Sequence, residues 1–143
     1  MFRKYEGGRS EKGFSLIELI VVLVILGLLA AVVAPNVYNK LAKGKDQIAK
    51  IQIKEIEGAL QLFSFDLGRN PTSAEGLEAL VRNPGNSDSW KGPYLAKALP
   101  RDPWGSDYQF LNPGVKGEID VFSLGADRAR GGEGSGADIG NWD

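Results

Sequence analysis

The 143-residue sequence contains no cysteine and no histidine. No disulfide can therefore brace the fold, and zinc sites of the usual kinds, histidine-based triads and thiol nucleophiles are excluded. Metal chemistry is restricted to oxygen ligands, which favours calcium or magnesium. The sequence has no phosphate-binding loop. Its net charge of −1 gives no indication of a nucleic-acid partner.

One long apolar run is present, at residues 14–34, and Pro35 follows it directly. A basic start followed by an apolar run is typical of a secretory signal peptide, but this run of 21 residues is longer than the 7–15 residues of a signal core. At about 1.5 Å per residue, a helix of this length spans roughly 30 Å, the thickness of the hydrocarbon layer of a bilayer. The sequence therefore predicts a single membrane-spanning helix.

Charges on the two sides of this run do not determine its orientation. Four basic residues precede the run, and five lysines follow it: Lys40, Lys43, Lys45, Lys50 and Lys54. The positive-inside rule consequently gives no clear direction.

Glu18 is the one acid in the apolar run. One interpretation is a plain signal anchor with a stray acid, although an acid at the centre of a membrane helix costs about 2.5–3.5 kcal/mol on insertion scales. If the chain is cut after Gly13, the new amino group of Phe14 lies one turn from Glu18 and also becomes available to the Glu18 of a neighbouring chain. We therefore hypothesise that Glu18 sets the register between subunits in a helical stack.

A long helix is predicted at residues 14–67, about 80 Å if unbroken. Pro35 kinks a helix without having to end it, and Gly27 is a second weak point for a kink or for melting. Gly68 provides a C-cap, and Pro71 prevents continuation. Beyond Pro35, apolar residues recur at helical spacing and are expected to pack on a small domain: Val37, Leu41, Ile48, Ile51, Ile56, Ala59, Leu60 and Phe63.

Charged residues fill most of the other face of this second half. One interpretation is a solvated face over a domain core. The alternative is that some of these side chains meet charges on neighbouring subunits: Lys43, Lys50, Glu57 and Asp66. Such pairs contribute about 0–1 kcal/mol each, but they can set register when they are repeated along a fibre.

The rest of the chain predicts a small α+β domain. A capping-box pattern at residues 72–75 opens a short helix that ends near Val81, and residues 83–86 have turn chemistry. Residues 90–103 are expected to form an ordered loop. Two strands, at residues 108–111 and 118–124, are expected to form a hairpin around residues 112–117. The tryptophans are expected to anchor the core or the loops: Trp90, Trp104 and Trp142.

The tail, at residues 125–143, is rich in glycine and acids. A disordered tail is one interpretation, because a glycine-rich loop loses much conformational entropy on ordering. Ile139 and Trp142 resemble anchors, which favours a loop tied at both ends. The tail also offers hard oxygen donors of the kind that calcium prefers, in Asp127, Glu133, Asp138, Ser135 and the loop carbonyls. Their spacing does not match an EF-hand.

A short motif at the start of the apolar run resembles the prepilin peptidase site of type IV pilins and pseudopilins: Gly13-Phe14-Ser15-Leu16-Ile17-Glu18. The resemblance implies that the bond after Gly13 is cut on the cytoplasmic side, that the new amino group of Phe14 is methylated, and that Glu18 serves assembly. It also implies a leader (residues 1–13), a transmembrane and polymerisation helix (14–34) and a periplasmic domain (35–143).

Later motifs narrow the resemblance to the major pseudopilins of type II secretion, and the match extends nearly throughout residues 13–142. They are Asn70-Pro71-Thr72 with Glu75-Gly76-Leu77-Glu78-Ala79-Leu80, Leu99-Pro100-Arg101-Asp102-Pro103-Trp104-Gly105, Tyr108, Asn112-Pro113-Gly114, Ser123-Leu124-Gly125-Ala126-Asp127, Gly132-Glu133-Gly134 and Ala137-Asp138-Ile139-Gly140-Asn141-Trp142. The implied fold is α+β and pilin-like. A long N-terminal helix packs on a short helix and a small antiparallel sheet, and calcium stabilises the C-terminal loop.

Major pseudopilins bind calcium in this loop, so the resemblance implies a calcium site. It assigns side-chain ligands to Asp127 and Asp138 and further oxygen ligands to Leu124, Arg130 and Ser135. The sequence departs from the family pattern at two positions. Arg128 stands where glycine is frequent, and Gly136 stands where a polar or acidic residue is common.

The implied function is that of a structural subunit and not of an enzyme. The subunit waits in the bacterial inner membrane and polymerises into a short periplasmic fibre that moves folded proteins through an outer-membrane channel. The energy comes from a cytoplasmic ATPase. The implied partners are further copies of the chain, minor pseudopilins, the inner-membrane assembly platform, the prepilin peptidase and membrane lipid.

Two alternatives stay open at this stage. A minor pseudopilin or a type IV pilin subunit is the nearest, although a surface pilin more often carries a C-terminal disulfide. A membrane-anchored periplasmic calcium-binding or hydrolytic domain belongs to another class. Paired acids can serve hydrolysis, but the acids here lie in a glycine loop, and Asp102 and Asp107 lie in turn-like sequence.

Overall fold

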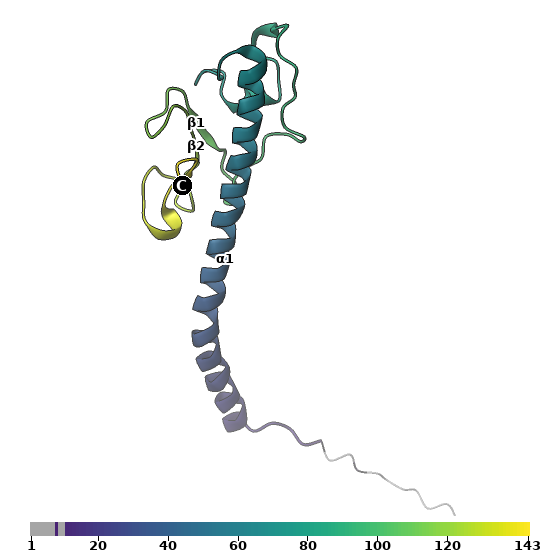
Figure 1. Ribbon diagram of the computed structural model, residues 1–143. Coiled ribbons are helices and arrows are strands. Elements are labelled where there is room, and N and C mark those ends of the chain that lie inside the picture. Colours follow the sequence, from purple (N-terminus) through teal and green to yellow (C-terminus); the bar gives the residue numbers. More distant parts are fainter. Residues whose placement is uncertain (1–7, 9–10) are drawn as a thin grey trace, which may run out of the picture. The chain divides into compact units, whose positions relative to one another are not determined.

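The computed structural model describes Gly8 and residues 11–143 (Figure 1). It has one long helix, α1 (Leu16–Leu67), and three short 3₁₀ helices, η1 (Leu77–Leu80), η2 (Pro84–Asn86) and η3 (Gly134–Gly136). Three strands complete it: β1 (Gln109–Leu111), β2 (Asp120–Ser123) and β3 (Ile139–Gly140). The chain divides into two compact units with a boundary between Asn39 and Lys40, inside α1.

The predicted long helix is confirmed, with its first residue two positions later than expected. Pro35 lies inside α1, as the sequence predicted. The helix ends where Gly68 adopts a positive φ of 71° and donates its amide to the Ser64 carbonyl (2.8 Å). A residue without Cβ adopts this conformation without strain, so the glycine C-cap is confirmed.

The core of the second unit forms on one face of α1. Six residues of that face are buried: Ala49, Ile53, Ile56, Ala59, Leu60 and Phe63. They share a single cluster with residues from the rest of the unit, including Leu80, Tyr108 and Val121. Burial of each large apolar side chain contributes about 1.5–3 kcal/mol. This packing, more than intrinsic helix propensity, stabilises the second half of α1.

The predicted core face of α1 is partly wrong. Ile48 and Ile51 are 49% and 57% exposed, whereas Ala49 and Ile53 are buried. The reason is that α1 carries two apolar stripes. The buried stripe follows steps of four and three residues from Ala49, and a second stripe on the outward side contains Ile48, Ile51, Leu62 and Phe65. Periodicity alone does not tell which stripe is buried, and the prediction combined parts of both. Val37 and Leu41, also predicted to pack, are exposed as well.

The sheet has the order β1-β2-β3, and both pairs are antiparallel. The predicted hairpin is confirmed, with Gln109 opposite Phe122 and Leu111 opposite Asp120. Figure 1 shows this hairpin beside the second half of α1. The sequence did not predict β3, because a strand of two residues shows no alternating pattern. β3 pairs with the end of β2, where Ile139 lies opposite Ser123.

The segment after α1 is stabilised by a capping box that does not open an α-helix. The Glu75 amide donates to Thr72 Oγ1 (3.1 Å) and the Thr72 amide to Glu75 Oε2 (2.9 Å), while Arg69 donates two hydrogen bonds to the same carboxylate. Gly76 then adopts a positive φ of 65°, which ends the helical path, and only the short η1 follows. The predicted helix from residue 72 to Val81 is therefore wrong in type and extent.

The predicted turn and loop that follow are confirmed. Asn83 accepts the Ser87 amide and donates to the Ser87 carbonyl (both 2.9 Å), and η2 lies within this turn. Residues 90–103 contain no helix or strand, yet they are ordered by the core. Trp90 Nε1 donates to the Ala79 carbonyl (2.8 Å), and the Tyr94 amide donates to the Leu80 carbonyl (2.8 Å).

Candidate functional site

The predicted cleavage motif lies at the start of α1. Gly13 and Phe14 precede the first helical turn, and the Phe14 side chain is 88% exposed. Residues 1–7, 9 and 10 of the predicted leader lie outside the described residues. The scissile bond proposed from the sequence is therefore in a non-helical, exposed stretch, which is the form of backbone that a peptidase binds most readily.

Glu18 makes a contact within its own chain that the sequence analysis missed. The Ser15 amide donates to Glu18 Oε2, and the Glu18 amide donates to Ser15 Oγ (both 3.2 Å). This reciprocal pair is a capping box on the first turn of α1, where a negative charge also interacts favourably with the helix dipole. The signal was present in the sequence as Ser-x-x-Glu. The other oxygen, Oε1, takes no part in the box and remains able to accept a hydrogen bond.

The apolar half of α1 is uncovered in the first unit. No residue from Phe14 to Ala34 is buried, and the exposed side chains include Leu16, Leu28 and Val32. By length and composition this is the one helix among the described residues that could cross a membrane. A surface of this size and apolarity is not stable in water, so lipid or another apolar chain must cover it.

Of the two positions predicted as weak points, Gly27 lies in the uncovered apolar half of α1, and Pro35 directly follows the last residue of that half. A Cβ placed on Gly27 would meet no atom within 4 Å, so the glycine is not required there by local packing. Pro35 cannot donate a backbone hydrogen bond. Next to it, Asn36 Nδ2 donates to the Val32 carbonyl (3.3 Å). A kink or melting at Gly27 and Pro35 stays a prediction.

The C-terminal glycine loop, residues 124–138, is held by its two aspartates. Asp127 Oδ1 accepts the Ala129 amide, and Asp138 Oδ2 accepts the Gly131 amide (both 3.0 Å). Each carboxylate thus uses one oxygen to order the loop backbone. Asp138 Oδ1 is buried and has no hydrogen-bond partner. A buried carboxylate oxygen without a partner is costly, which favours a cation at this position.

Asp127 also directs its second oxygen into the loop. A Cβ on Gly132 would lie 2.7 Å from Asp127 Oδ2, and a Cβ on Gly136 would lie 3.0 Å from the same atom. The loop therefore needs glycine at residue 132, and Gly136 is tightly packed against this carboxylate. Because Asp138 binds Gly131 and Asp127 Oδ2 lies against Gly132, the two carboxylates converge on the same dipeptide.

Backbone carbonyls would have to complete a metal site here. Among the described residues, no group of three or more acidic side chains could hold a metal ion. The Ser135 carbonyl faces the start of the loop, where it accepts the Ala126 amide (3.1 Å). A guanidinium is a cation without an acceptor atom, so only the backbone carbonyl of Arg130 could serve as a ligand. The Arg130 side chain itself lies over the Phe122 ring (5.6 Å to its centroid). Carboxylates with carbonyls form a donor set that fits calcium.

The far end of the glycine loop is anchored as predicted. Ile139 is buried in the core, and the Trp142 ring lies 5.5 Å from the Phe122 ring, measured between centroids. The prediction of a loop tied at both ends is confirmed.

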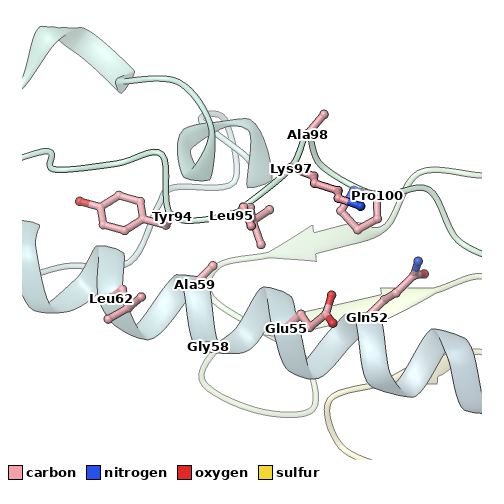
Figure 2. Close-up of a pocket in the computed structure, with 11 residues that line it drawn as sticks. Gln52, Glu55, Gly58, Ala59, Leu62, Tyr94, Leu95, Lys97, Ala98 and Pro100 are labelled. Atoms are coloured by element: carbon pink, nitrogen blue, oxygen red, sulfur yellow. The ribbon is translucent and has the colours of Figure 1, made fainter.

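A groove on the second unit was not predicted from the sequence. It lies between α1 and residues 94–100, with a cavity volume of about 770 Å³ (Figure 2). Leu62, Leu95 and Pro100 give it an apolar lining, and Glu55 and Lys97 add charges. The groove arises because a segment without regular structure crosses a helix, a geometry that has no signal in periodicity.

Of the four charged side chains predicted to meet neighbouring subunits, one is engaged within its own chain. Asp66 Oδ2 accepts the Tyr94 hydroxyl (2.8 Å). Burial raises the pKa of Tyr94, and the Asp66 charge raises it further. Within the described residues, Lys43, Lys50 and Glu57 form no salt bridge.

Comparisons with known proteins agree with this architecture. A family model described as "Prokaryotic N-terminal methylation motif" matches residues 8–34, and one described as "Type II secretion system (T2SS), protein G" matches residues 36–142. Two relatives named type II secretion system core protein G are 51% identical over 137 residues (Vibrio cholerae; 94% of this chain, 93% of the relative) and 49% identical over 138 residues (Pseudomonas aeruginosa; 94% and 97%).

A solved structure shows the same fold. The crystal structure of the major pseudopilin from the type 2 secretion system of enterohaemorrhagic Escherichia coli aligns with a TM-score of 0.63 and 37% identity, over 72% of this chain and 87% of that chain. The long N-terminal helix, the small antiparallel sheet and the methylation motif define a pseudopilin. More narrowly, the chain belongs to the protein G family of the type II secretion system.

Proposed function

We propose that this chain polymerises through α1 into the periplasmic pseudopilus of a type II secretion system, and that the fibre drives export of folded proteins across the outer membrane. The observation that carries the proposal is the uncovered apolar half of α1. Before assembly, lipid of the inner membrane covers this half. In the fibre, the same half of other copies replaces the lipid.

Processing precedes assembly in this proposal. A prepilin peptidase cuts between Gly13 and Phe14, and the new amino group of Phe14 is methylated. The match of the methylation motif to residues 8–34 supports this step, as does the non-helical backbone at Gly13. The capping box presents the Glu18 carboxylate at the start of α1, where the amine of its own or a neighbouring chain can pair with it.

The partners follow from the same scheme. The second unit lies in the periplasm, and the apolar half of α1 crosses the inner membrane once. Besides further copies of the chain, the partners are minor pseudopilins, the inner-membrane assembly platform, the prepilin peptidase and lipid. The role is structural and not enzymatic. In support, the buried carboxylates of Asp102 and Asp120 are occupied by hydrogen bonds that order loops.

We also propose that the glycine loop holds a calcium ion. Asp127 and Asp138 would provide carboxylate oxygens, and the carbonyls of Leu124, Arg130 and Ser135 would provide further oxygens. The support is the buried, unpaired Asp138 Oδ1 and the inward position of Asp127 Oδ2. Bound calcium supplies a positive charge that joins the two ends of a loop with few apolar contacts.

N-terminal sequencing and intact mass of the protein from cells with and without the peptidase test the main proposal. We expect a mature chain that begins with methylated Phe14. Gly13→Leu blocks cleavage, whereas Gly8→Leu, the matched change at the other described leader glycine, leaves it intact. A mature chain that begins at Met1 or after Ala34 contradicts membership of the processed, fibre-forming class.

A further inference from the structure

We propose that Asp102 is a positioning residue for the glycine loop and that, through Ser123, it sets the calcium affinity of the chain. This inference rests on the calcium site proposed above. It assigns a role to a buried acid that lies outside the loop, more than twenty positions earlier in the sequence.

Asp102 is 4% exposed and uses both carboxylate oxygens. Oδ1 accepts the amides of Trp104 (3.1 Å) and Ser106 (2.8 Å), which closes the turn at residues 102–106. Oδ2 accepts the hydroxyl of Ser123 (2.6 Å). The carboxylate therefore ties this turn to the last residue of β2.

Ser123 transmits this contact to the loop. Its side chain is completely buried, and its Oγ also accepts the Gly125 amide (3.1 Å). A hydroxyl has a single hydrogen to donate. Once that hydrogen is given to Asp102, Oγ can act only as an acceptor, and it accepts the Gly125 amide. The two hydrogen bonds form a relay from the Gly125 amide through the Ser123 hydroxyl to Asp102, and Asp102 fixes its direction. The relay in turn fixes the backbone between the proposed ligands Leu124 and Asp127.

The position of Gly125 in turn determines the opposite side of the loop. Gly125 has a positive φ of 73°, and a Cβ there would lie 2.6 Å from the Ala137 carbonyl. The next residue, Ala126, donates its amide to the Ser135 carbonyl (3.1 Å). A displacement of Gly125 therefore moves the start of the loop and the proposed ligand Ser135 together.

The turn at residues 102–106 also holds the loop beyond Asp127. Arg128 donates from its guanidinium to the Trp104 carbonyl (2.8 Å). This contact compensates the positive φ of 55° at Arg128, a position where glycine would be free of strain. The turn thus makes one hydrogen bond on each side of Asp127. Asp102 accepts from Ser123 before it, and the Trp104 carbonyl accepts from Arg128 after it. Residues of this kind, which orient ligands without binding the metal, typically change metal affinity 10–100-fold when they are mutated.

Asp120 provides a matched control. It is also a buried aspartate, 2% exposed, and it accepts three backbone amides, of Val115, Lys116 and Gly117. Those amides belong to the hairpin loop and not to the glycine loop. Replacing either aspartate by asparagine removes one buried charge, but only the change at Asp102 breaks the relay.

The test is calcium titration of the full-length chain in detergent micelles by isothermal calorimetry, after treatment with a chelator. We expect Asp102→Asn and Ser123→Ala to weaken calcium binding about 10–100-fold. Asp120→Asn is expected to lower the unfolding temperature with a dissociation constant within about twofold of wild type. The double variant with Asp102→Asn and Ser123→Ala should bind calcium about as weakly as whichever of the two single variants binds it less tightly, because both changes break the same relay. Amide exchange at Gly125 in calcium-free protein should accelerate at least about tenfold in Ser123→Ala.

The outcomes separate the two proposals. Wild-type calcium affinity in a folded Ser123→Ala protein, or equal losses in the Asp102 and Asp120 variants, overturns the positioning role and leaves the calcium site intact. Absence of calcium binding by the wild-type chain overturns the site itself and this inference with it. Ser123→Ala removes a single oxygen, so it keeps the test decisive where Asp102→Asn does not fold.

Discussion

Glu18 combines two roles at the scale of a single residue. Within its chain it closes a capping box with Ser15, which stabilises the first turn of α1. In the proposed fibre, its charge pairs with the amine that exists only after Gly13 has been removed. The sequence hypothesis that Glu18 serves assembly alone was therefore incomplete. The box accounts for how the carboxylate is oriented before any neighbour arrives.

Glu18→Gln and Glu18→Ala separate these roles. Glutamine can still accept the Ser15 amide but carries no charge, whereas alanine loses both the box and the charge. We expect both variants to reduce fibre assembly by about tenfold or more, because a pair worth about 1.4 kcal/mol changes an equilibrium tenfold. Amide exchange at Leu19 should accelerate only in the alanine variant. The readouts are cross-linked multimers in cells and hydrogen exchange in micelles.

Ser15→Ala is the matched control for the charge, since it breaks the box and keeps the carboxylate. It should fray the first turn and retain most assembly. Normal assembly by Glu18→Gln contradicts the proposed pairing with the amine.

Asp120 predicts a specific dependence of stability on pH. Burial acts to raise the pKa of Asp120, but three backbone hydrogen bonds and the Lys116 charge outweigh it, so the pKa lies below its ordinary value. The folded state thus favours the charged form. Its contribution to stability is complete above the pKa of the unfolded chain, near 3.8, and is lost as the pH falls through the lower pKa of the folded state.

Asp120→Asn should destabilise the second unit by about 1.5–3 kcal/mol at pH 7, the usual range for hydrogen bonds to a charged group. The difference from wild type should shrink as the pH falls below about 4. Denaturant unfolding of the chain at a series of pH values, followed by near-ultraviolet circular dichroism, measures it. If the difference in free energy of unfolding between Asp120→Asn and wild type does not change with pH, the loss comes from altered hydrogen-bond geometry and not from the lost charge of Asp120.

At the scale of elements, α1 shows what the sequence could and could not predict. Its end at Gly68 and its passage through Pro35 were predicted correctly, because caps and breakers are local signals. The buried face was predicted only in part, because Ile48 and Ile51 belong to an apolar stripe that faces outward. Which stripe packs depends on the sheet and the loops, and these are tertiary facts.

The candidate site shows the same division. Asp127 and Asp138 were selected by residue type and motif, and the structure places both carboxylates against Gly131 and Gly132. The relay from Asp102 could not be predicted, because it joins two segments that are adjacent only after folding. The Ser15 capping box has a signal in the sequence, Ser-x-x-Glu at residues 15–18, but that signal lies within a run whose apolar residues indicate a membrane span.

Two phenylalanines of α1 test the assignment of its faces. Phe63 is completely buried and Phe65 is 87% exposed. Phe63→Ala should destabilise the second unit by about 3–5 kcal/mol through cavity formation. Phe65→Ala, the same change two residues later, should alter stability by no more than about 0.5 kcal/mol. Urea unfolding of the full chain compares them, and similar losses in both variants contradict the structure's placement of the two rings.

At the scale of the whole molecule, the glycine loop is where calcium would add most to stability. The chain has no disulfide, and the loop contributes few apolar residues to the core. A ligand that binds only the folded state stabilises it by about 2.7 kcal/mol at a free concentration of one hundred times its dissociation constant. Removal of calcium should therefore affect the entire second unit and not the loop alone.

We expect a chelator to lower the unfolding temperature of the wild-type chain by several degrees, following the usual relation between free energy and melting temperature, about 4–8 °C per kcal/mol for a unit of this size. For Asp127→Ala and for Asp138→Ala, the unfolding temperature of each variant should be the same with and without chelator. Glu118→Ala, which removes an exposed acid outside the loop, should keep the wild-type response. Differential scanning fluorimetry in micelles records these values, and a wild-type protein indifferent to chelator rules out the calcium site.

Trp142 gives the glycine loop an optical signature. Its ring lies 4.1 Å from the Lys116 ammonium and packs on Phe122, directly after β3 closes the sheet. Indole emission responds to nearby charge and to water, so loosening of the loop changes the spectrum of this residue. Substitution of Trp90 and Trp104 by phenylalanine leaves Trp142 as the single tryptophan, whose indole can be excited selectively. The ordering of the loop can then be followed in real time, without an added label.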